Sequence, residues 1–269
     1  MPLLTSKTFP VPLSITHIGT ATAIISINGV NILTDPFFSP SGTSFPIGPT
    51  ALITSSGPAL TLTNLPPIDA ILLSHEDHPD NLDPLGRQLL DGRKVLTTVS
   101  GAATLAPRPG VVGLKPHETV KLFAGGQTFY VTATPCEHLP GGECIGFIIS
   151  AEAFGKSADG KKNVIYFSGD TVYIPELAKI KEKYHVAVAL LNLGAAVAVL
   201  ESGPLTITMD GKEGARLFKE IGAEVLVPMH FESWNHFTQG KEDLEKVFKE
   251  EGVSDKVLWL EPGKETKVA

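Results

Sequence analysis

Short apolar runs separated by turn residues dominate the first third of the chain and predict strands. Residues 14–18 alternate between polar and apolar, residues 23–27 are mostly apolar, and a further apolar run covers 30–35 after Asn28-Gly29. An Asn-Gly pair between two such runs is a strong signal for a β-hairpin. We therefore expect an antiparallel pair of strands that is joined at this turn and ends at Pro36.

The next segments continue with short elements. Residues 37–67 are rich in Pro, Gly, Ser and Thr and predict a long surface loop. The apolar run 68–73 predicts a strand covered on both faces. Asp80 or Asn81 is a good N-cap for a helix that continues to Leu90. Beyond it, we expect a short helix over 101–105 and strands over 94–98, 120–122, 127–134, 144–150 and 163–168.

Helical and strand patterns alternate in the second half of the chain. Apolar residues at helical spacing predict helices over 173–184, 210–221 and 241–251. Apolar runs between and after them predict strands over 186–193, 224–228 and 256–260. Strands that come first and then alternate with helices fit an α/β fold, which we interpret as a four-layer αββα sandwich forming a single domain over residues 1–269.

Composition excludes some classes of protein. Hydrophobic residues make up 42% of the 269 residues, as in folded globular chains. The 22 basic residues against 29 acidic ones argue against a nucleic-acid partner. No apolar stretch approaches the roughly 20 residues of a membrane-spanning helix. The two cysteines, Cys136 and Cys144, fit a reducing compartment, with one extracellular pair as the minor alternative, so we expect a cytoplasmic protein. We also expect a small-molecule substrate and a chain compatible with a homo-oligomer.

Several histidines and one aspartate follow directly after predicted strands. His75 and His78 come after the run ending at Leu73, and the others are His138, Asp170 and His230. The ends of strands are where α/β folds assemble their sites. A zinc-type ion takes three or four nitrogen, sulfur or carboxylate ligands. These residues are therefore candidate ligands of a divalent metal.

Five segments in this order resemble the metallo-β-lactamase superfamily. They are Thr34–Pro36, Ser74–Asp83, Thr134–His138, Ser168–Thr171 and Pro228–His230. The opening Thr16–Ala21 and the tail His230–Phe237 are most similar to the branch that contains L-ascorbate-6-phosphate lactonase and the N-acylphosphatidylethanolamine phospholipase D. The resemblance covers residues 13 to 262 and implies the fold and a metal; it says much less about the substrate.

The histidine motif departs from the family's His-x-His-x-Asp-His. Alignment on Asp80 makes His78 the second histidine and puts Asn81 where the last histidine stands, and His75 is then the first if one residue is inserted. Alignment on His75 instead puts Asp77 in a histidine position, so the choice between His75 and Asp77 stays open. We favour the insertion because Asp80 to Asp83 keeps the family pattern with a single change.

The resemblance then implies two metal positions of unequal strength. One draws on His75, His78 and His138 with Asp170, and the other on Asp80, Asp170 and His230. The second lacks an imidazole at Asn81, and an amide oxygen is a harder and weaker donor. We expect one or two divalent ions, with Zn²⁺ the first choice and Mn²⁺ as the alternative in the weaker position.

The expected function is hydrolysis by a metal-bound hydroxide, because such an ion lowers the pKa of water to about 7. The favoured reaction opens a lactone or an ester. Asp80 and His236 are the candidate catalytic residues: the former orients the water and the latter donates a proton. Trp234 is a candidate pocket wall, and His17 and Asp35 are candidates for holding ligand imidazoles in place.

Other interpretations are kept beside these. Asp80 and Asn81 could simply cap a helix, His17 and Asp35 could be structural, and Trp234 could be packing. His236 could be a solvated loop residue. Cys136, beside the metal loop, could be taken for a ligand, but we expect a small buried residue instead. The alternative functions are a phosphodiesterase or phospholipase, for which Arg87 is the nearby cation, and a non-hydrolytic metal-binding protein of the same fold.

Overall fold

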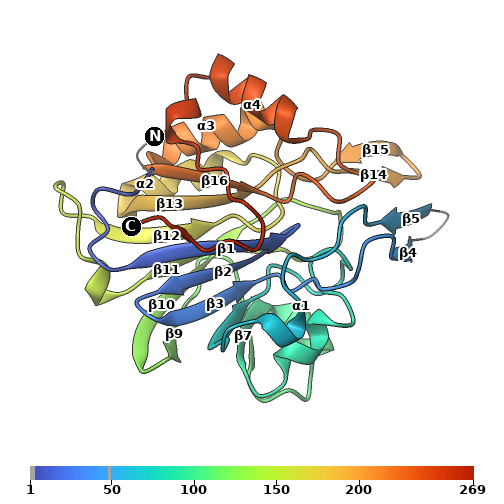
Figure 1. The fold of residues 1–269 in the computed structure, drawn as a ribbon, viewed down its shortest axis with the longest axis horizontal. Helices are drawn as coiled ribbons and strands as arrows, with labels where there is room; N and C mark the ends of the chain where they lie inside the picture. Colours follow the sequence, from blue (N-terminus) through green and yellow to red (C-terminus); the bar gives the residue numbers. More distant parts are fainter. Residues whose placement is uncertain (1–3, 48–49) are drawn as a thin grey trace.

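A computed structural model describes residues 4–47 and 50–269, and most of its strands form two sheets that pack face to face (Figure 1). The first sheet has the strand order β17-β1-β2-β3-β6-β7-β8. Its strands are β1 (Leu13–Gly19), β2 (Thr22–Ile27), β3 (Val30–Thr34), β6 (Ala70–Leu72), β7 (Lys94–Thr98), β8 (Val111–Leu114) and β17 (Thr266–Lys267). The predicted hairpin is confirmed: Ile27 pairs with Val30, and Asn28 and Gly29 form the turn, both with positive φ.

The second sheet has the order β16-β13-β12-β11-β10-β9. Its strands are β9 (Thr119–Ala124), β10 (Gln127–Pro135), β11 (Ile145–Ser150), β12 (Lys162–Phe167), β13 (Tyr184–Asn192) and β16 (Val225–Met229). β13 runs parallel to both of its neighbours, whereas β9 to β12 are antiparallel. The carboxyl ends of β12, β13 and β16 therefore meet at one edge of the sheet.

Helices cover the outer face of each sheet, which completes the predicted four layers (Figure 1). The second sheet is covered by α2 (Ile180–Lys183), α3 (Gly211–Ile221) and α4 (Lys241–Glu250), while α1 (Val99–Thr104) and the 3₁₀ helix η2 (Gly86–Leu90) lie by the first. α3 starts with a capping box, in which the Asp210 side chain accepts from the Glu213 amide, and ends at Gly222 in the left-handed conformation. The four-layer α/β fold is thus confirmed.

The helix expected to start at Asp80 is wrong. Residues 80–85 form turns, and only η2 follows. Asp80 and Asn81 are both buried, and the carboxylate that accepts a backbone amide here is Asp83, which bonds the Gly86 amide at 2.7 Å. Gly86 lies so close to the Pro36 carbonyl that a Cβ would approach it to 1.7 Å. This close backbone contact and the inward side chains prevent a regular helix.

Other expectations need correction at the edges of the fold. The long loop contains a hairpin of β4 (Ser44–Ile47) and β5 (Thr50–Ile53) and the 3₁₀ helix η1 (Leu62–Asn64). In place of the helix expected over 173–184, the chain forms the short 3₁₀ helix η4 (Pro175–Lys179) followed by α2. The sequence did not predict the hairpin of β14 (Val197–Leu200) and β15 (Gly203–Thr206). It did not predict β8 either. Two further 3₁₀ turns are η3 (Glu152–Phe154) and η5 (Ser254–Lys256).

The strand expected over 256–260 is also wrong. Val257 forms a single β-bridge to Leu226, which belongs to the edge strand β16. Its side chain packs among the helices, and that of Leu258 packs between the sheets. The apolar pattern therefore reflects packing against two cores, without a strand ladder.

Phe129 tests the packing between the sheets. Its side chain is fully buried in the inter-sheet core and lies 6.2 Å from the Phe154 ring. Replacing it with alanine leaves a cavity, and we expect a loss of about 3–5 kcal/mol in the free energy of unfolding, measured with guanidinium. Phe123→Ala, at a side chain that is 65% exposed, should change it by about 0.5 kcal/mol or less. Equal losses in both variants would contradict this assignment of the core.

Candidate metal centre

The candidate ligands lie in loops that follow strands of both sheets. His75 and His78 come after β6 of the first sheet, whereas His138, Asp170 and His230 come after β10, β12 and β16 of the second. Residues far apart in the sequence are thus brought to one edge of the sandwich. They form two neighbouring groups of side chains, which we call the imidazole cluster (His75, His78, His138) and the carboxylate cluster (Asp80, Asp170, His230).

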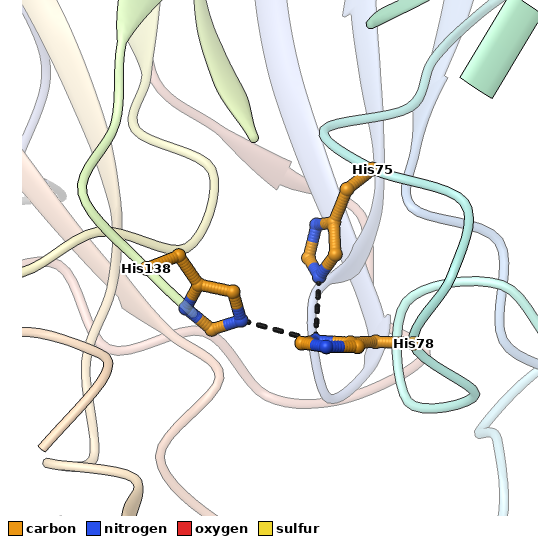
Figure 2. Close-up of side chains that lie close together, drawn as sticks. All are labelled: His75, His78 and His138. Carbon is orange, nitrogen blue, oxygen red and sulfur yellow. Dashed lines mark hydrogen bonds between the residues drawn. The ribbon is translucent and has the colours of Figure 1, made fainter. Parts of the chain in front are cut away.

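Three ring nitrogens converge in the imidazole cluster (Figure 2). His75 Nε2 lies 2.9 Å from His78 Nδ1, and His138 Nε2 lies 3.0 Å from the same atom. Burial lowers the pKa of both His75 and His138, and for His75 the neighbouring imidazoles lower it further. The rings are therefore neutral at pH 7, which is the form that binds a metal.

The carboxylate cluster is almost completely buried. His230 Nε2 lies 3.3 Å from Asp170 Oδ2 and 3.4 Å from Asp80 Oδ2. Burial by itself lowers the pKa of His230, but the two carboxylates outweigh it and raise that pKa to about 10. Burial would likewise raise the pKa of Asp80 and Asp170, and the neighbouring imidazoles hold both well below the usual range. The cluster is thus built to hold positive charge between two carboxylates.

Unpartnered atoms in this cluster fit a divalent ion. Among the described residues, Asp80 Oδ1 is buried without a hydrogen-bond partner, and His230 Nε2 has no hydrogen-bond geometry to the oxygens beside it. Buried polar atoms without partners are rare and call for an explanation. His230 also has a φ of 53°, which is uncommon for a residue other than glycine and is tolerated mostly at functional sites. Imidazole and carboxylate donors in this arrangement suit zinc or a similar cation.

Asp35 holds His75 in place through Ser74. Its carboxylate accepts the Ser74 amide at 2.7 Å and the Ser74 hydroxyl at 2.8 Å. The Ser74 hydroxyl uses its one proton in the hydrogen bond to Asp35. It can therefore only accept from His75, so His75 Nδ1–H donates to Ser74 Oγ at 2.9 Å. This fixes the tautomer that leaves Nε2 free to face the imidazole cluster. Burial raises the pKa of Asp35 to about 7.

Further contacts orient the other ligands, and sequence reasoning missed the residues that make them. His138 Nδ1 donates to the Ile207 carbonyl at 2.7 Å, which leaves Nε2 for the cluster. The Thr20 hydroxyl donates to the Asp80 carbonyl at 3.1 Å and lies 3.1 Å from His230 Nδ1. Asn192 Nδ2 donates to Asp170 Oδ1 at 2.7 Å. A polar residue at the end of the apolar run 186–193 was the available signal for Asn192.

The remaining predicted residues surround the clusters. Asn81 belongs to neither cluster, and its amide donates to Asp35 Oδ2 at 3.1 Å. His236 Nε2 lies 3.5 Å from Asp80 Oδ2, and the Trp234 ring lies 6.1 Å from the His236 ring. His17 Nε2 lies 3.0 Å from the Thr20 carbonyl and belongs to neither cluster.

The choice between His75 and Asp77 receives a geometric answer. The ring nitrogen of His75 lies inside the imidazole cluster, whereas Asp77 is exposed and belongs to neither cluster. Asp170 groups with Asp80 and His230, and its negative charge also acts on the imidazoles of His75 and His138. Cys136, expected to be buried, is half-buried.

Asp35→Asn tests the support of His75. The variant keeps the volume, but its one oxygen can accept from the Ser74 amide only by placing an NH₂ donor where Oδ2 accepts from the Ser74 hydroxyl and the Asn81 amide. We therefore expect metal affinity to fall by about 10–100-fold in a chelator competition assay. Asp77→Asn, in the same loop but exposed, is the matched control and should leave the affinity unchanged. The same affinity in both variants would rule out this role of Asp35.

The two packed sheets and the donor clusters at their edge define a metal-dependent hydrolase of the metallo-β-lactamase fold. The chain belongs to the family described as the beta-lactamase superfamily domain, whose sequence profile matches residues 30–231. The resemblance found in the sequence motifs is thereby confirmed.

Similar proteins agree with this family. A UPF0173 metal-dependent hydrolase of Methanopyrus kandleri is 26% identical over 93% of this chain and 97% of its own length. The mitochondrial N-acyl-phosphatidylethanolamine-hydrolyzing phospholipase D of Saccharomyces cerevisiae is 25% identical over 94% of this chain, which spans 55% of that longer protein. The crystal structure of an isothiocyanate hydrolase from Delia radicum gut bacteria matches the fold with a TM-score of 0.76 and 22% identity, covering 94% and 98% of the two chains.

No helix in the described part of the chain has the length and apolar character needed to cross a membrane.

Proposed function

We propose that the protein hydrolyses a lactone or an ester with one or two divalent ions held by the imidazole and carboxylate clusters. One observation carries the proposal: three imidazole nitrogens meet beside a buried group of two carboxylates and a further imidazole. In such a site, a bound ion lowers the pKa of water to about 7 and polarises the attacked carbonyl. Zinc suits the imidazole cluster, and the oxygen-rich carboxylate cluster would also accept manganese.

Asp80 is the residue that we assign to orienting the attacking water. Its Oδ2 faces His230 and His236, while its Oδ1 has no hydrogen-bond partner among the described residues. A carboxylate oxygen without a partner can accept a hydrogen bond from water, hold the water in place and take up its proton. Because the neighbouring imidazoles keep the pKa of Asp80 low, it stays ionised and available as an acceptor.

His236 is the residue that we assign to the leaving group. Its Nε2 lies 3.5 Å from Asp80 Oδ2, and its Nδ1 is buried without a partner in the described chain. An imidazole held by a carboxylate at one nitrogen can donate a proton to a substrate oxygen from the other. Asp80 and His236 would therefore work on opposite ends of the bond that breaks.

The surroundings favour an uncharged substrate. Trp234 packs at 5.0 Å from the Phe37 ring and 6.1 Å from the Phe45 ring, so an aromatic wall stands beside His236. Arg87, the cation expected to meet a phosphate, is bound to Glu76, whose carboxylate lies 3.0 Å away. Apart from a bound metal ion, a substrate phosphate would meet in Arg87 a cation that is already paired, whereas a lactone or ester carbonyl needs no cationic side chain.

A panel of lactones, carboxylic esters and phosphodiesters tests the substrate class. The zinc-loaded protein should hydrolyse a lactone or ester faster than any phosphodiester, lose that activity on chelation, and regain it on reloading. Equal rates for chelated and loaded protein would overturn the proposal. His236→Gln should lower kcat more than it changes KM if the imidazole acts on the leaving group.

A phosphodiesterase activity is the second candidate, because the yeast phospholipase D relative matches almost the whole chain. The same two clusters would serve that reaction. Phosphodiester cleavage faster than any ester cleavage would establish it. Tight metal binding without turnover on the whole panel would instead point to a non-hydrolytic metal-binding role. A cytoplasmic location, a small-molecule substrate, no nucleic-acid partner, homo-oligomer formation and a single domain over residues 1–269 stay predictions.

A further inference from the structure

The two cysteines stand just beyond the paired ends of two neighbouring strands. In the β10–β11 ladder, Thr134 pairs with Gly146 and Pro135 with Ile145, which is the last pair. Cys136 follows β10 and Cys144 precedes β11, so each is one residue beyond that pair. The thiols are close enough to interact, because burial and then the neighbouring Cys136 thiol raise the pKa of Cys144. A disulfide spans Cα separations of about 4.4–6.8 Å, and opposite residues at the end of an antiparallel ladder lie within that range.

Both thiols also point to the same turn of the chain. Cys136 Sγ donates to the Ser168 carbonyl at 3.3 Å, and Cys144 Sγ donates to the Asp170 carbonyl at 3.2 Å. These acceptors are two residues apart in the loop that carries Asp170. Both sulfurs therefore lie beside the same short loop.

Each of the two cysteines is next to a histidine of the imidazole cluster. Cys144 Sγ lies 3.6 Å from His75 Nδ1, and Cys136 precedes His138 by two residues. Cys144 is buried and Cys136 is half-buried, so a small oxidant reaches the Cys136 sulfur first. Neither sulfur belongs to the imidazole or carboxylate cluster, and the proposed hydrolysis uses neither.

We propose that Cys136 and Cys144 are a redox modification site, at which a peroxide converts the two thiols into a cross-strand disulfide that weakens metal binding. The Cys136 sulfur attacks hydrogen peroxide, an S–O bond forms, the O–O bond breaks, and the leaving hydroxide takes the thiol proton and departs as one water, which leaves a sulfenic acid. The Cys144 sulfur then attacks that sulfur, the S–S bond forms, the S–O bond breaks, and the leaving hydroxide takes the Cys144 thiol proton and departs as a second water. Two electrons pass from the sulfurs to the peroxide, so the step is balanced.

The disulfide changes contacts that support the ligands. Forming it removes both S–H donors, so the carbonyls of Ser168 and Asp170 lose their hydrogen bonds. The loop between them is tightly packed, because a Cβ at Gly169 would lie 2.6 Å from the Ile145 carbonyl. The sulfur of Cys144 also moves relative to His75 as it approaches Cys136. Loss of such supporting contacts typically weakens metal binding about 10–100-fold.

The experiment treats the zinc-loaded full chain with hydrogen peroxide, with and without later reduction by dithiothreitol. Non-reducing peptide mapping should recover one linked pair that contains Cys136 and Cys144, with the mass of two hydrogen atoms lost. Zinc affinity from chelator competition should fall about 10–100-fold on oxidation and recover on reduction. Cys136→Ser, whose hydroxyl can still donate to the Ser168 carbonyl, should show no loss of affinity that dithiothreitol reverses.

Three results would overturn the proposal. They are a Cys136 oxidised to sulfinic acid beside a free Cys144, a disulfide between two chains, and a mapped Cys136–Cys144 bond that leaves zinc affinity unchanged. Cys144→Ala is a second variant that removes the attacking thiol and should also abolish the reversible loss. Peptide mapping and zinc affinity need no substrate, so they give an answer even if the proposed lactone or ester hydrolysis fails.

Discussion

Replacing Asp170 with asparagine is expected to reduce kcat/KM on the best substrate by about 10³-fold or more. The change keeps the size of the side chain but removes the charge that lies 3.3 Å from His230 and also acts on His75 and His138. An ion-stabilised transition state is worth several kcal/mol, and each 1.36 kcal/mol corresponds to about tenfold in rate. Steady-state kinetics together with elemental analysis of the variant would measure both effects.

The control for this variant is Asp159→Asn. Asp159 is an exposed carboxylate that pairs with Lys161 at 2.9 Å and belongs to neither cluster. It should keep the wild-type kcat/KM and metal content. If Asp170→Asn retained both as well, Asp170 could not be a ligand, and the carboxylate cluster would have no role in the reaction.

Removing the metal is expected to lower the melting temperature by about 8–16 °C. A ligand at about 1,000 times its Kd stabilises the folded state by about 4 kcal/mol, and about 1 kcal/mol corresponds to roughly 2–4 °C in domains near this size. Without an ion, the carboxylate cluster keeps Asp80 Oδ1 without a partner among the described residues. Calorimetry of the chelated and reloaded protein would measure the shift.

The fall in melting temperature on chelation should require an intact imidazole cluster. In His138→Ala, which removes one of three converging nitrogens, chelation should change the melting temperature much less than in the wild type. His117→Ala is the matched control, since this histidine is exposed and pairs with Glu176 instead. A chelation effect of the same size in His138→Ala and the wild type would show that the ion binds elsewhere.

The central strands could be predicted from sequence because their residues carry a clear pattern. β1, β2 and β3 follow from the alternation and the Asn28-Gly29 turn, and β13 from an uninterrupted apolar run. The hairpin of β4 and β5 was missed because its residues are exposed or half-buried and carry many turn formers. Strands at the rim of the fold bury little apolar surface, so the alternation of apolar and polar residues along them is weak.

The failure at Asp80 has a different cause. Local sequence favours a helix there, and tertiary contacts override it, because the site requires Asp80 and Asn81 to point inward. Conflicts of this kind between local preference and fold are expected at functional sites.

The candidate ligands could be found because each follows a strand, but the contacts that orient them could not. Ser74 reaches Asp35 across 39 positions, and His138 meets the Ile207 carbonyl across 69. No local pattern encodes such a pairing, since it depends on how the two sheets pack. Ser74 and Thr20 therefore became visible only in the folded chain.

Anomalous diffraction from crystals grown with zinc, recorded on both sides of the zinc edge, would show where the ions bind. We expect a peak bound by His75, His78 and His138, with a second, weaker peak at Asp80, Asp170 and His230 if that position is filled. Full-strength zinc peaks that lie only at surface residues, with the imidazole cluster empty, would contradict this assignment of the ligands.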